Sequence, residues 1–239
     1  MNFDKSMYSI NKGLWGTSVG GKETLSSKGM LPEEAWPTQV TKHESEEVKL
    51  HFEKGELRKV NDKPFHHPTD AIQYLQTIAG PYGIGRDIHV GDTIIGIKGR
   101  VGFEAAAPMV ILKAHHALEK HVLTKWQLTL KDQLSQFYGN WLHEGQILDP
   151  VMRDIEAFLE TSQRNVTGDV LIQLHPYRFI IVGIESPYDL MNSKFGKYGE
   201  MNKGWSGEDV RGFSKIFGNQ TMIYHQVKGT SPNPSKGGA

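Results

Sequence analysis

The residues from Gly16 to Lys22 have the spacing of a phosphate-binding loop, G-x-x-x-x-G-K. In such a loop Ser or Thr follows the lysine, because that hydroxyl holds the magnesium ion of a nucleotide. Here Glu23 follows, and its carboxylate would repel the phosphates. The loop should also lead from an apolar strand into a helix, but the residues before it are polar and Pro32 comes soon after. We therefore favour a flexible Gly-rich segment with another role.

Eleven histidines raise the question of a metal site. The sequence HHALEKH places His115 and Glu119 four residues apart on a predicted helix, with His116 beside them. A zinc site needs a further ligand of matching geometry, and the sequence H-E-x-x-H does not occur. A polar helix face with ordinary hydrogen bonds is the favoured interpretation. His66 and His67 precede a proline in a loop, and we expect both to be exposed.

Three basic residues, Arg86, Lys98 and Arg100, gather around a Gly-rich strand edge. Together they could hold an anionic or carboxylate ligand, although surface charges on a hairpin explain them equally well. The nearby YGIGRD lacks the third glycine of a dinucleotide motif and follows a helix, so we interpret it as a turn. No Ser-His-Asp signature is present in the sequence. We assign no catalytic residue and no metal ligand.

The composition excludes several classes of protein. The 239 residues carry 27 basic and 27 acidic side chains, so charge gives no reason to expect nucleic acid or an anionic membrane as the partner. No apolar run approaches the roughly 20 residues of a membrane span, and the N-terminus has no apolar signal core. The absence of cysteine excludes disulfides and thiolate chemistry. A cytoplasmic protein is the expectation.

The elements that must position these residues follow from their patterns. Residues 1–45 look irregular. Alternation predicts a hairpin over 46–60 around Lys54-Gly55, a short strand over 93–97, two strands over 168–186 hinged at His175-Pro176 with the second one central, and a last strand over 220–227. Helical spacing predicts helices over 67–80 (capped by Thr69 or Asp70), 108–123 (opened by Pro108), 124–142 (capped by Thr124), 149–163 (started by Asp149-Pro150), 187–196, and 206–218 (capped by Ser206). Strand pairs, then helices, then strand pairs indicate an α+β fold.

Five segments, in this order, resemble the C-terminal half of argininosuccinate synthases: YSINKGLWGTSVGG, AGPYGIGRDIHVGDTIIGIKGRVGFEAAAP, YGNWLHEG, SQRNVTGDV and ESPYDL. The likeness runs from about Tyr8 to Tyr224. It implies an α+β fold with a mixed or antiparallel sheet and packed helices. It also divides the chain into a substrate-loop segment over 1–45, a synthetase and multimerisation domain over 46–227, and a disordered tail over 228–239.

Members of this family join citrulline to aspartate with ATP in arginine biosynthesis. ATP with Mg is bound mainly by an N-terminal domain, whose Ser-Gly-Gly-x-Asp loop does not occur in this sequence. The resemblance therefore implies the substrate-binding and oligomerisation half of the ligase. Alone, this half is expected to be inactive and to bind no cofactor. In the intact enzyme, it is expected to belong to a homotetramer.

The resemblance also identifies a citrulline site. By position, Ser9 and Ser18 match two serines that contact citrulline, and the glycines around them (13, 16, 20 and 21) would let the backbone approach the ligand. The family's Glu and Tyr contacts are missing, because Gly91 and Phe103 stand at those positions. Either Asp92 or Glu104 replaces them, or binding has changed. The long C-terminal helix of the family also looks absent.

Two rival functions remain open at this stage. The chain could be an inactive assembly domain whose helices from Pro108 to Gln163 form the subunit interface. It could also be a small-ligand sensor that retains the citrulline pocket and has lost catalysis.

Overall fold

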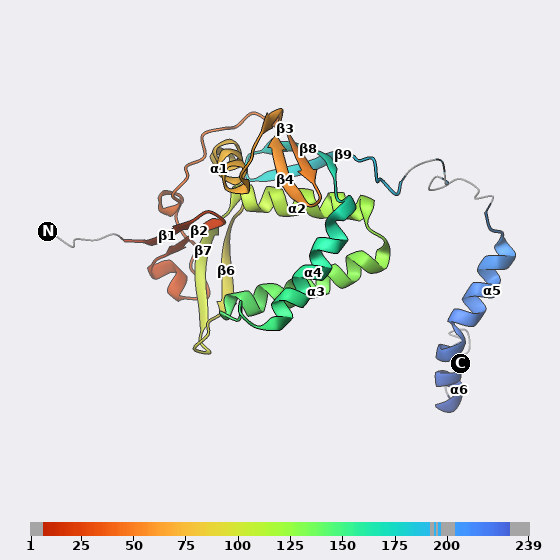
Figure 1. The fold of residues 1–239 in the computed structure, drawn as a ribbon. Coiled ribbons are helices and arrows are strands. Elements are labelled where there is room, and N and C mark those ends of the chain that lie inside the picture. Colours follow the sequence, from red (N-terminus) through yellow and green to blue (C-terminus); the bar gives the residue numbers. More distant parts are fainter. Residues whose placement is uncertain (1–6, 192–193, 195, 197–203, 230–239) are drawn as a thin grey trace, which may run out of the picture. The chain divides into compact units, whose positions relative to one another are not determined.

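The computed structural model of the chain describes residues 7–191, 194, 196 and 204–229. It divides into two compact units, Met1–Leu190 and Met191–Ala239, which are described separately. The first unit contains two antiparallel sheets and four α-helices among its described residues (Figure 1). The predicted α+β class is confirmed, and the sheets are antiparallel throughout.

The larger sheet has the strand order β5-β4-β3-β8-β9. Its strands are β3 (Glu46–Glu53), β4 (Glu56–Val60), β5 (Lys63–Pro64), β8 (Gly168–His175) and β9 (Arg178–Glu185). Both predicted hairpins are confirmed, one turning at Lys54-Gly55 and the other at Pro176-Tyr177. The prediction that β9 is central is wrong. It lies at the edge, because β8 pairs with both β3 and β9 and no described strand follows on the far side of β9.

Two helices cover one face of this sheet, α1 (Pro68–Ala79) and α2 (Ala106–Val122). Leu50 and Leu174 of the sheet are fully buried against Leu75 of α1 and Leu118 of α2. The predicted caps of α1 are wrong. His67 is the N-cap and Pro68 occupies the first turn, where its fixed φ suits a helix start. Helix α2 begins two residues before Pro108 for the same reason, since a proline is tolerated within the first turn.

The smaller sheet has the order β1-β2-β7-β6. Its strands are β1 (Ser9–Gly13), β2 (Gly16–Gly20), β6 (Arg86–Asp92) and β7 (Lys98–Glu104). The expectation that residues 1–45 are irregular is therefore wrong for the first hairpin. The segment that follows it holds only the short 3-10 helices η1 (Lys22–Leu25) and η2 (Glu33–Ala35). Two further 3-10 turns, η3 (Gly80–Tyr82) and η4 (Gln163–Asn165), end α1 and α4.

The strand predicted over 93–97 is wrong, because these residues form the turn between β6 and β7. The backbone amide of Thr93 donates to the carbonyl of Ile97 (3.1 Å), and the amide of Gly96 donates to the carbonyl of Thr93 (2.9 Å). The apolar run Ile94-Ile95 is exposed on this turn. Its apolar character therefore does not reflect burial in a sheet.

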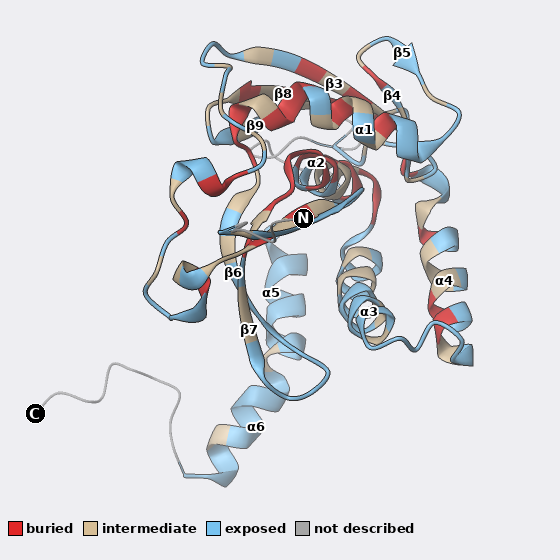
Figure 2. Cartoon of the chain, turned by 90° about the vertical axis from the view of Figure 1, so that its left-hand side faces the viewer, coloured by how far each residue is buried: buried red, intermediate tan, exposed pale blue. Residues whose placement is uncertain are grey.

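The helices α3 (Lys125–His143) and α4 (Pro150–Ser162) pack against each other. Their predicted starts are confirmed, since Thr124 forms a capping box with Gln127 and the Asp149 carboxylate accepts from the Val151 amide (3.0 Å). Helix α4 buries Met152 and Ile155, but α3 has no buried residue (Figure 2).

In the second unit, α5 (Gly207–Phe217) begins at the predicted capping box of Ser206 and Asp209. The strand predicted over 220–227 is wrong, because α6 (Asn219–Val227) takes its place. The described part of this unit offers no strand to pair with, so a helix is the way to satisfy the backbone hydrogen bonds internally. None of the described helices combines the length and apolar character that a membrane crossing requires.

Two predictions fall partly or wholly outside the described residues. Of the short helix expected over 187–196, the described residues 187–191 form turns. The tail expected over 228–239 is described only to residue 229.

Candidate functional site

The register of the smaller sheet brings four distant positions onto one face. Directly paired residues of antiparallel strands point to the same face, and residues two apart in a strand share it. Ser18 pairs with Phe103, which in turn pairs with Asp87 in β6. Ser9 pairs with Gly20, two residues from Ser18. Both serines therefore share a face with positions 103 and 91, and we call this the serine face.

The opposite face of the same sheet is covered by its own chain. Val19 and Ile88 point to that side and pack with Trp36, Leu31 and Ala35. Gly102 belongs there too, because a Cβ at this position would lie 2.2 Å from Leu31 Cδ1. One side of the sheet is thus filled by residues 31–36, which leaves the serine face as the side open to a ligand.

Asp92 and Glu104, considered from the sequence as substitutes for the missing family contacts, do not lie on the serine face. Glu104 points to the covered side, where its Oε1 accepts from the Thr38 hydroxyl (2.7 Å). Asp92 also points to that side and forms an ion pair with Lys98 (2.5 Å). Both carboxylates therefore have partners within the fold.

The polar groups of the serine face are available. Ser9 is exposed and Ser18 is half-buried, and neither hydroxyl has a hydrogen-bond partner among the described residues. The Phe103 ring stands beside them and meets the His89 ring edge-on, with centroids 6.0 Å apart. Sequence reasoning missed His89 and Asp87. Their alternation with Gly91 along β6 is the signal that would have identified them.

Two of the four glycines near the serines have a packing role. A Cβ on Gly16 would lie 2.4 Å from the Phe103 ring, and one on Gly21 would lie 2.7 Å from the Tyr8 ring. At Gly20, by contrast, the nearest side-chain atom is Ser9 Cβ at 4.0 Å. Close approach of a ligand to the backbone is therefore possible beside Ser9. The stretch 16–20 is itself a strand, which is not the geometry of a phosphate-binding loop.

The three basic residues do not form one cluster. Arg86 pairs in register with Glu104, and Lys98 lies at the other end of the hairpin, opposite Asp92. The Arg86 guanidinium is buried, forms an ion pair with Glu33 (2.7 Å) and lies over Trp36.

Arg100 also has a structural role. Its guanidinium donates to the carbonyls of Glu23 (3.1 Å), Ser26 (2.6 Å) and Gly29 (2.6 Å). It thereby fixes the loop after β2. An anion held jointly by Arg86, Lys98 and Arg100 does not fit this arrangement.

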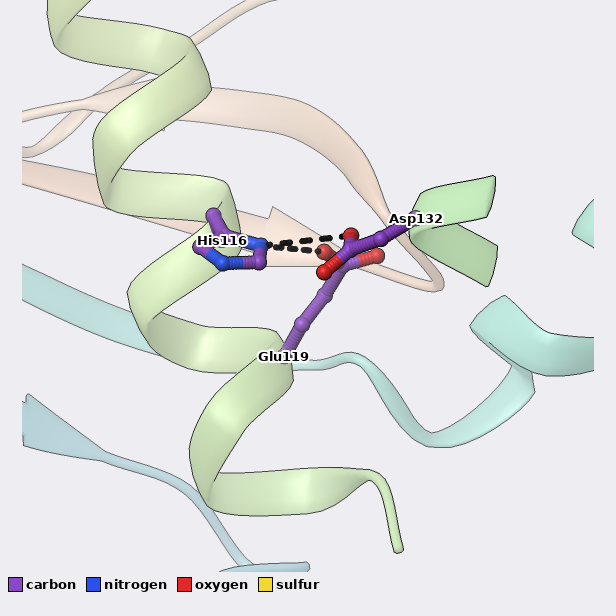
Figure 3. A group of neighbouring side chains, drawn as sticks. All are labelled: His116, Glu119 and Asp132. Atoms are coloured by element: carbon purple, nitrogen blue, oxygen red, sulfur yellow. Dashed lines mark hydrogen bonds and ion pairs between the residues drawn. The ribbon is translucent and has the colours of Figure 1, made fainter. Parts of the chain in front are cut away.

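The histidine-rich stretch of α2 does have a third acidic or histidine neighbour, Asp132 of α3 (Figure 3). The ligand atoms of His116, Glu119 and Asp132 all lie within 4.8 Å of one another. However, the Lys131 ammonium lies 2.6 Å from Glu119 Oε2 and 3.0 Å from Asp132 Oδ1. A single lysine thus already forms an ion pair with each of these carboxylates, so we interpret the group as an ion-pair network between α2 and α3.

The pKa values in this network reflect burial and charge. Burial lowers the pKa of Lys131, but its hydrogen bond to the Glu119 carboxylate and the charges of Glu119 and Asp132 outweigh burial and raise the pKa overall. The pKa of His115 is lowered, chiefly because burial disfavours its charged form. Its Nε2 lies 2.9 Å from the Gln163 side-chain oxygen. Burial thus favours the neutral form of His115, whereas the carboxylates favour the charged form of Lys131. His66 and His67 are exposed, as predicted.

Comparisons with known proteins identify the family. The family described as "Arginosuccinate synthase C-terminal domain" matches residues 8–224 of this chain. The chain is 36% identical over 228 residues to an argininosuccinate synthase of Xanthomonas axonopodis pv. citri, covering 92% of this chain and 53% of that protein. It is 37% identical over 223 residues to one of Dictyoglomus turgidum, covering 92% and 55%.

A third relative, an argininosuccinate synthase of Methanocaldococcus jannaschii, is 33% identical over 228 residues, which are 94% of this chain and 57% of that protein. The chain thus spans about half the length of the curated relatives it matches. The family match begins at Tyr8 and so includes the first hairpin, the serine face and the helices α1 to α4. The chain belongs to the argininosuccinate synthase family and contains its C-terminal domain.

Proposed function

We propose that this chain is the citrulline-binding and oligomerising half of an argininosuccinate synthase. The observation that carries the proposal is the serine face. Positions 9, 18, 91 and 103 are separated by up to 94 residues in the sequence, and strand register places all four on one open side of one sheet. These are the positions at which the family resemblance assigns citrulline contacts.

The chemistry of this face suits citrulline. Citrulline is a zwitterion with a neutral ureido tail, so hydroxyl groups and backbone amides can bind it without a strongly charged pocket. Ser9 and Ser18 offer two hydroxyls that have no partner in the described structure. With Gly91 and Phe103 at the other two positions, this face provides fewer polar contacts than the family pattern and depends more on the serines.

In the proposed reaction the ureido oxygen of citrulline attacks the α-phosphate of ATP, and pyrophosphate leaves. The aspartate nitrogen then displaces AMP to give argininosuccinate. The strand at 16–20 does not fit a triphosphate, so we assign ATP, Mg and aspartate to parts of the enzyme outside this chain. The chain's own contribution is to orient citrulline for attack, which lowers the barrier by positioning rather than by covalent catalysis.

The test is pyrophosphate release from ATP in the presence of citrulline and aspartate. It compares the 239-residue chain alone with the same chain joined to the nucleotide-binding half of the Xanthomonas relative. Release that depends on citrulline and occurs only in the joined protein is the expected result. No release in either protein would contradict the proposed function. Release by the chain alone would contradict our interpretation of Gly16–Lys22.

We also propose that α3 contributes to the subunit contact of a homo-oligomer. This helix buries none of its residues, yet it carries four large apolar side chains that are each more than 40% exposed: Trp126, Leu130, Phe137 and Leu142. Exposed apolar surface of this kind is typical of protein–protein interfaces. An assembly role and a role in citrulline binding are compatible, because α3 and the serine face belong to different elements.

A further inference from the structure

A cavity of about 490 Å³ is lined by residues of β6, α2 and β9. Both strands are edges, β6 of the smaller sheet and β9 of the larger one. Asp87 and His89 of the serine face form one wall of this cavity, but Ser9 and Ser18 do not line it. The cavity therefore adjoins the proposed citrulline site and shares Asp87 and His89 with the serine face, but the two serines lie outside it.

Two cations without partners are among the residues that line this cavity. Lys113 comes from α2 and Arg178 from the first position of β9, and neither has an ion pair or a hydrogen bond within the described part of the chain. The third basic residue in the wall, Arg86, is already occupied by Glu33 and by the carbonyl of Thr38. Asp87 is the one acidic residue in the wall, and its Oδ1 accepts from the Ile88 amide (2.7 Å). That amide leaves the charge of the carboxylate in place, so Lys113, Arg178 and Asp87 together carry one net positive charge.

The remainder of the wall is largely apolar. Met109 lies one turn before Lys113 on α2, so the two side chains share a helix face. Phe179 and Ile181 lie two apart on β9 and point to the same side. A ligand lodged here would meet hydrocarbon along its body and positive charge at one end.

Tyr177 forms the rim and is held in an unusual conformation. Its φ of 63° is in the left-handed region, which non-glycine residues seldom adopt. Its amide donates to the carbonyl of Tyr82 (2.8 Å), and its ring packs over Gly83, where a Cβ would lie 3.0 Å from the ring. This conformation belongs to the turn between β8 and β9, in which Tyr177 follows Pro176. Here the result is an exposed aromatic ring at the mouth of the cavity.

We propose that this cavity binds an organic carboxylate. Lys113 and Arg178 hold the carboxylate group, and the carbon body lies against Met109, Phe179 and Ile181. The ligand is distinct from the citrulline bound by the two serines. A compact inorganic anion fits less well, because it would leave the apolar wall uncovered.

The test uses benzoate as the probe and benzamide as its uncharged counterpart of nearly equal shape. The 239-residue chain is labelled with ¹³C at its methionine methyl groups, and the Met109 signal is assigned with the variant Met109→Leu. Titration with benzoate should shift the Met109 signal to saturation. Benzamide should bind roughly tenfold or more weakly, since it lacks the charge-assisted hydrogen bonds.

The variant Lys113→Gln/Arg178→Gln should lose the preference for benzoate. A matched control, Lys120→Gln/Arg164→Gln, removes two exposed basic residues that do not line the cavity. This control should retain the preference for benzoate over benzamide. The variant Ser9→Ala/Ser18→Ala should also keep it, so failure of the serine site and failure of this site are distinguishable. All three variants change solvent-accessible side chains, and circular dichroism checks that each is folded.

Three outcomes would overturn the proposal. The first is equal affinity for benzoate and benzamide. The second is unchanged benzoate binding in Lys113→Gln/Arg178→Gln. The third is displacement of benzoate by inorganic phosphate at equal concentration, since this would mean that the apolar wall contributes nothing to binding.

Discussion

Ser9 and Ser18 are the residues on which the proposed substrate site depends most directly. In the joined enzyme described above, Ser9→Ala or Ser18→Ala should each raise the KM for citrulline about fivefold, because each removes one hydrogen bond of about 1 kcal/mol. The KM for ATP should not change. Steady-state kinetics test this, with Ser45→Ala in an exposed loop as the control. Unchanged citrulline kinetics in both variants would remove the site assignment.

Gly91 offers a gain-of-contact experiment. A Cβ at this position would have no atom within 4 Å, and its φ is not in the left-handed region, so a larger side chain fits without strain. Gly91→Glu restores the family carboxylate on the serine face and should lower the KM for citrulline by roughly fivefold. Gly212→Glu on α5 is the comparison, because a Cβ there also has no atom within 4 Å and its φ is not in the left-handed region. If Gly91→Glu leaves citrulline affinity the same or weaker, the serine face does not bind citrulline in the family's manner.

At the scale of elements, Lys131 holds α3 to α2. Glu119 is fully buried and its Oε2 lies 2.6 Å from the Lys131 ammonium. Lys131→Met should lower the free energy of unfolding by about 3 kcal/mol, because the variant removes the lysine counter-charge of a buried carboxylate and leaves it only its contacts with Gln163 and its histidine neighbours. Urea denaturation measures this, with Lys120→Met on the exposed side of α2 as the control.

The double variant Lys131→Met/Glu119→Gln separates lost charge pairing from lost packing. It removes both charges, so it should be more stable than Lys131→Met alone. A double variant as unstable as the single one would show that the packing of the lysine stem, rather than the ion pair, anchors α3.

His115 makes the junction of α2 with η4 sensitive to pH. Its pKa is lowered from the usual 6.5, chiefly by burial. Below about pH 6.5 the unfolded chain therefore binds a proton at His115 that the folded chain does not bind. The stability of the folded chain is therefore unaffected by His115 above that pH and decreases as the pH falls below it. His115→Gln should lose less stability than the natural chain between about pH 7.5 and about pH 5.5. Urea midpoints at both pH values measure the difference, and the exposed-histidine variant His66→Gln should behave like the natural chain.

At the scale of the whole molecule, the proposed subunit contact through α3 predicts that the chain associates with itself. Phe137 stacks on Trp141 with ring centroids 5.5 Å apart. Trp126, near the start of the same helix, is 72% exposed. Trp126→Glu/Phe137→Glu should lower the molar mass measured by light scattering, because charges are costly in an apolar interface. The control is Ile95→Glu on the turn between β6 and β7. A natural chain that is monomeric would contradict the assembly role.

Several elements were predictable because their signals are local. The helix starts at Thr124, Asp149 and Ser206 are set by side chains that bond to amides two or three residues away. The hairpin at Lys54-Gly55 is likewise specified by a turn and by alternation in the strands beside it.

Other elements could not be predicted from the residues within and beside them. The apolar run Ile94-Ile95 looks like a strand, yet its place in a turn depends on the pairing of the two strands that flank it. The edge position of β9 depends on the pairing of β8 with β3 and β9. The sequence of α6 alternates like that of a strand, but the segment is helical because the described residues of the second unit offer no strand to pair with.

By itself, the sequence determined the α+β class and the family, because both rest on residue types in a fixed order along the chain. From the same order it predicted a role for the two serines, and that role stays a prediction. Only the tertiary structure decided which side chains meet. Strand register placed Asp87 and His89 beside the serines and turned Asp92 and Glu104 away. It also separated Arg86 from Lys98. The physical reason is that a side chain's face is fixed by the pairing between strands, which the separation of residues along the chain does not reveal.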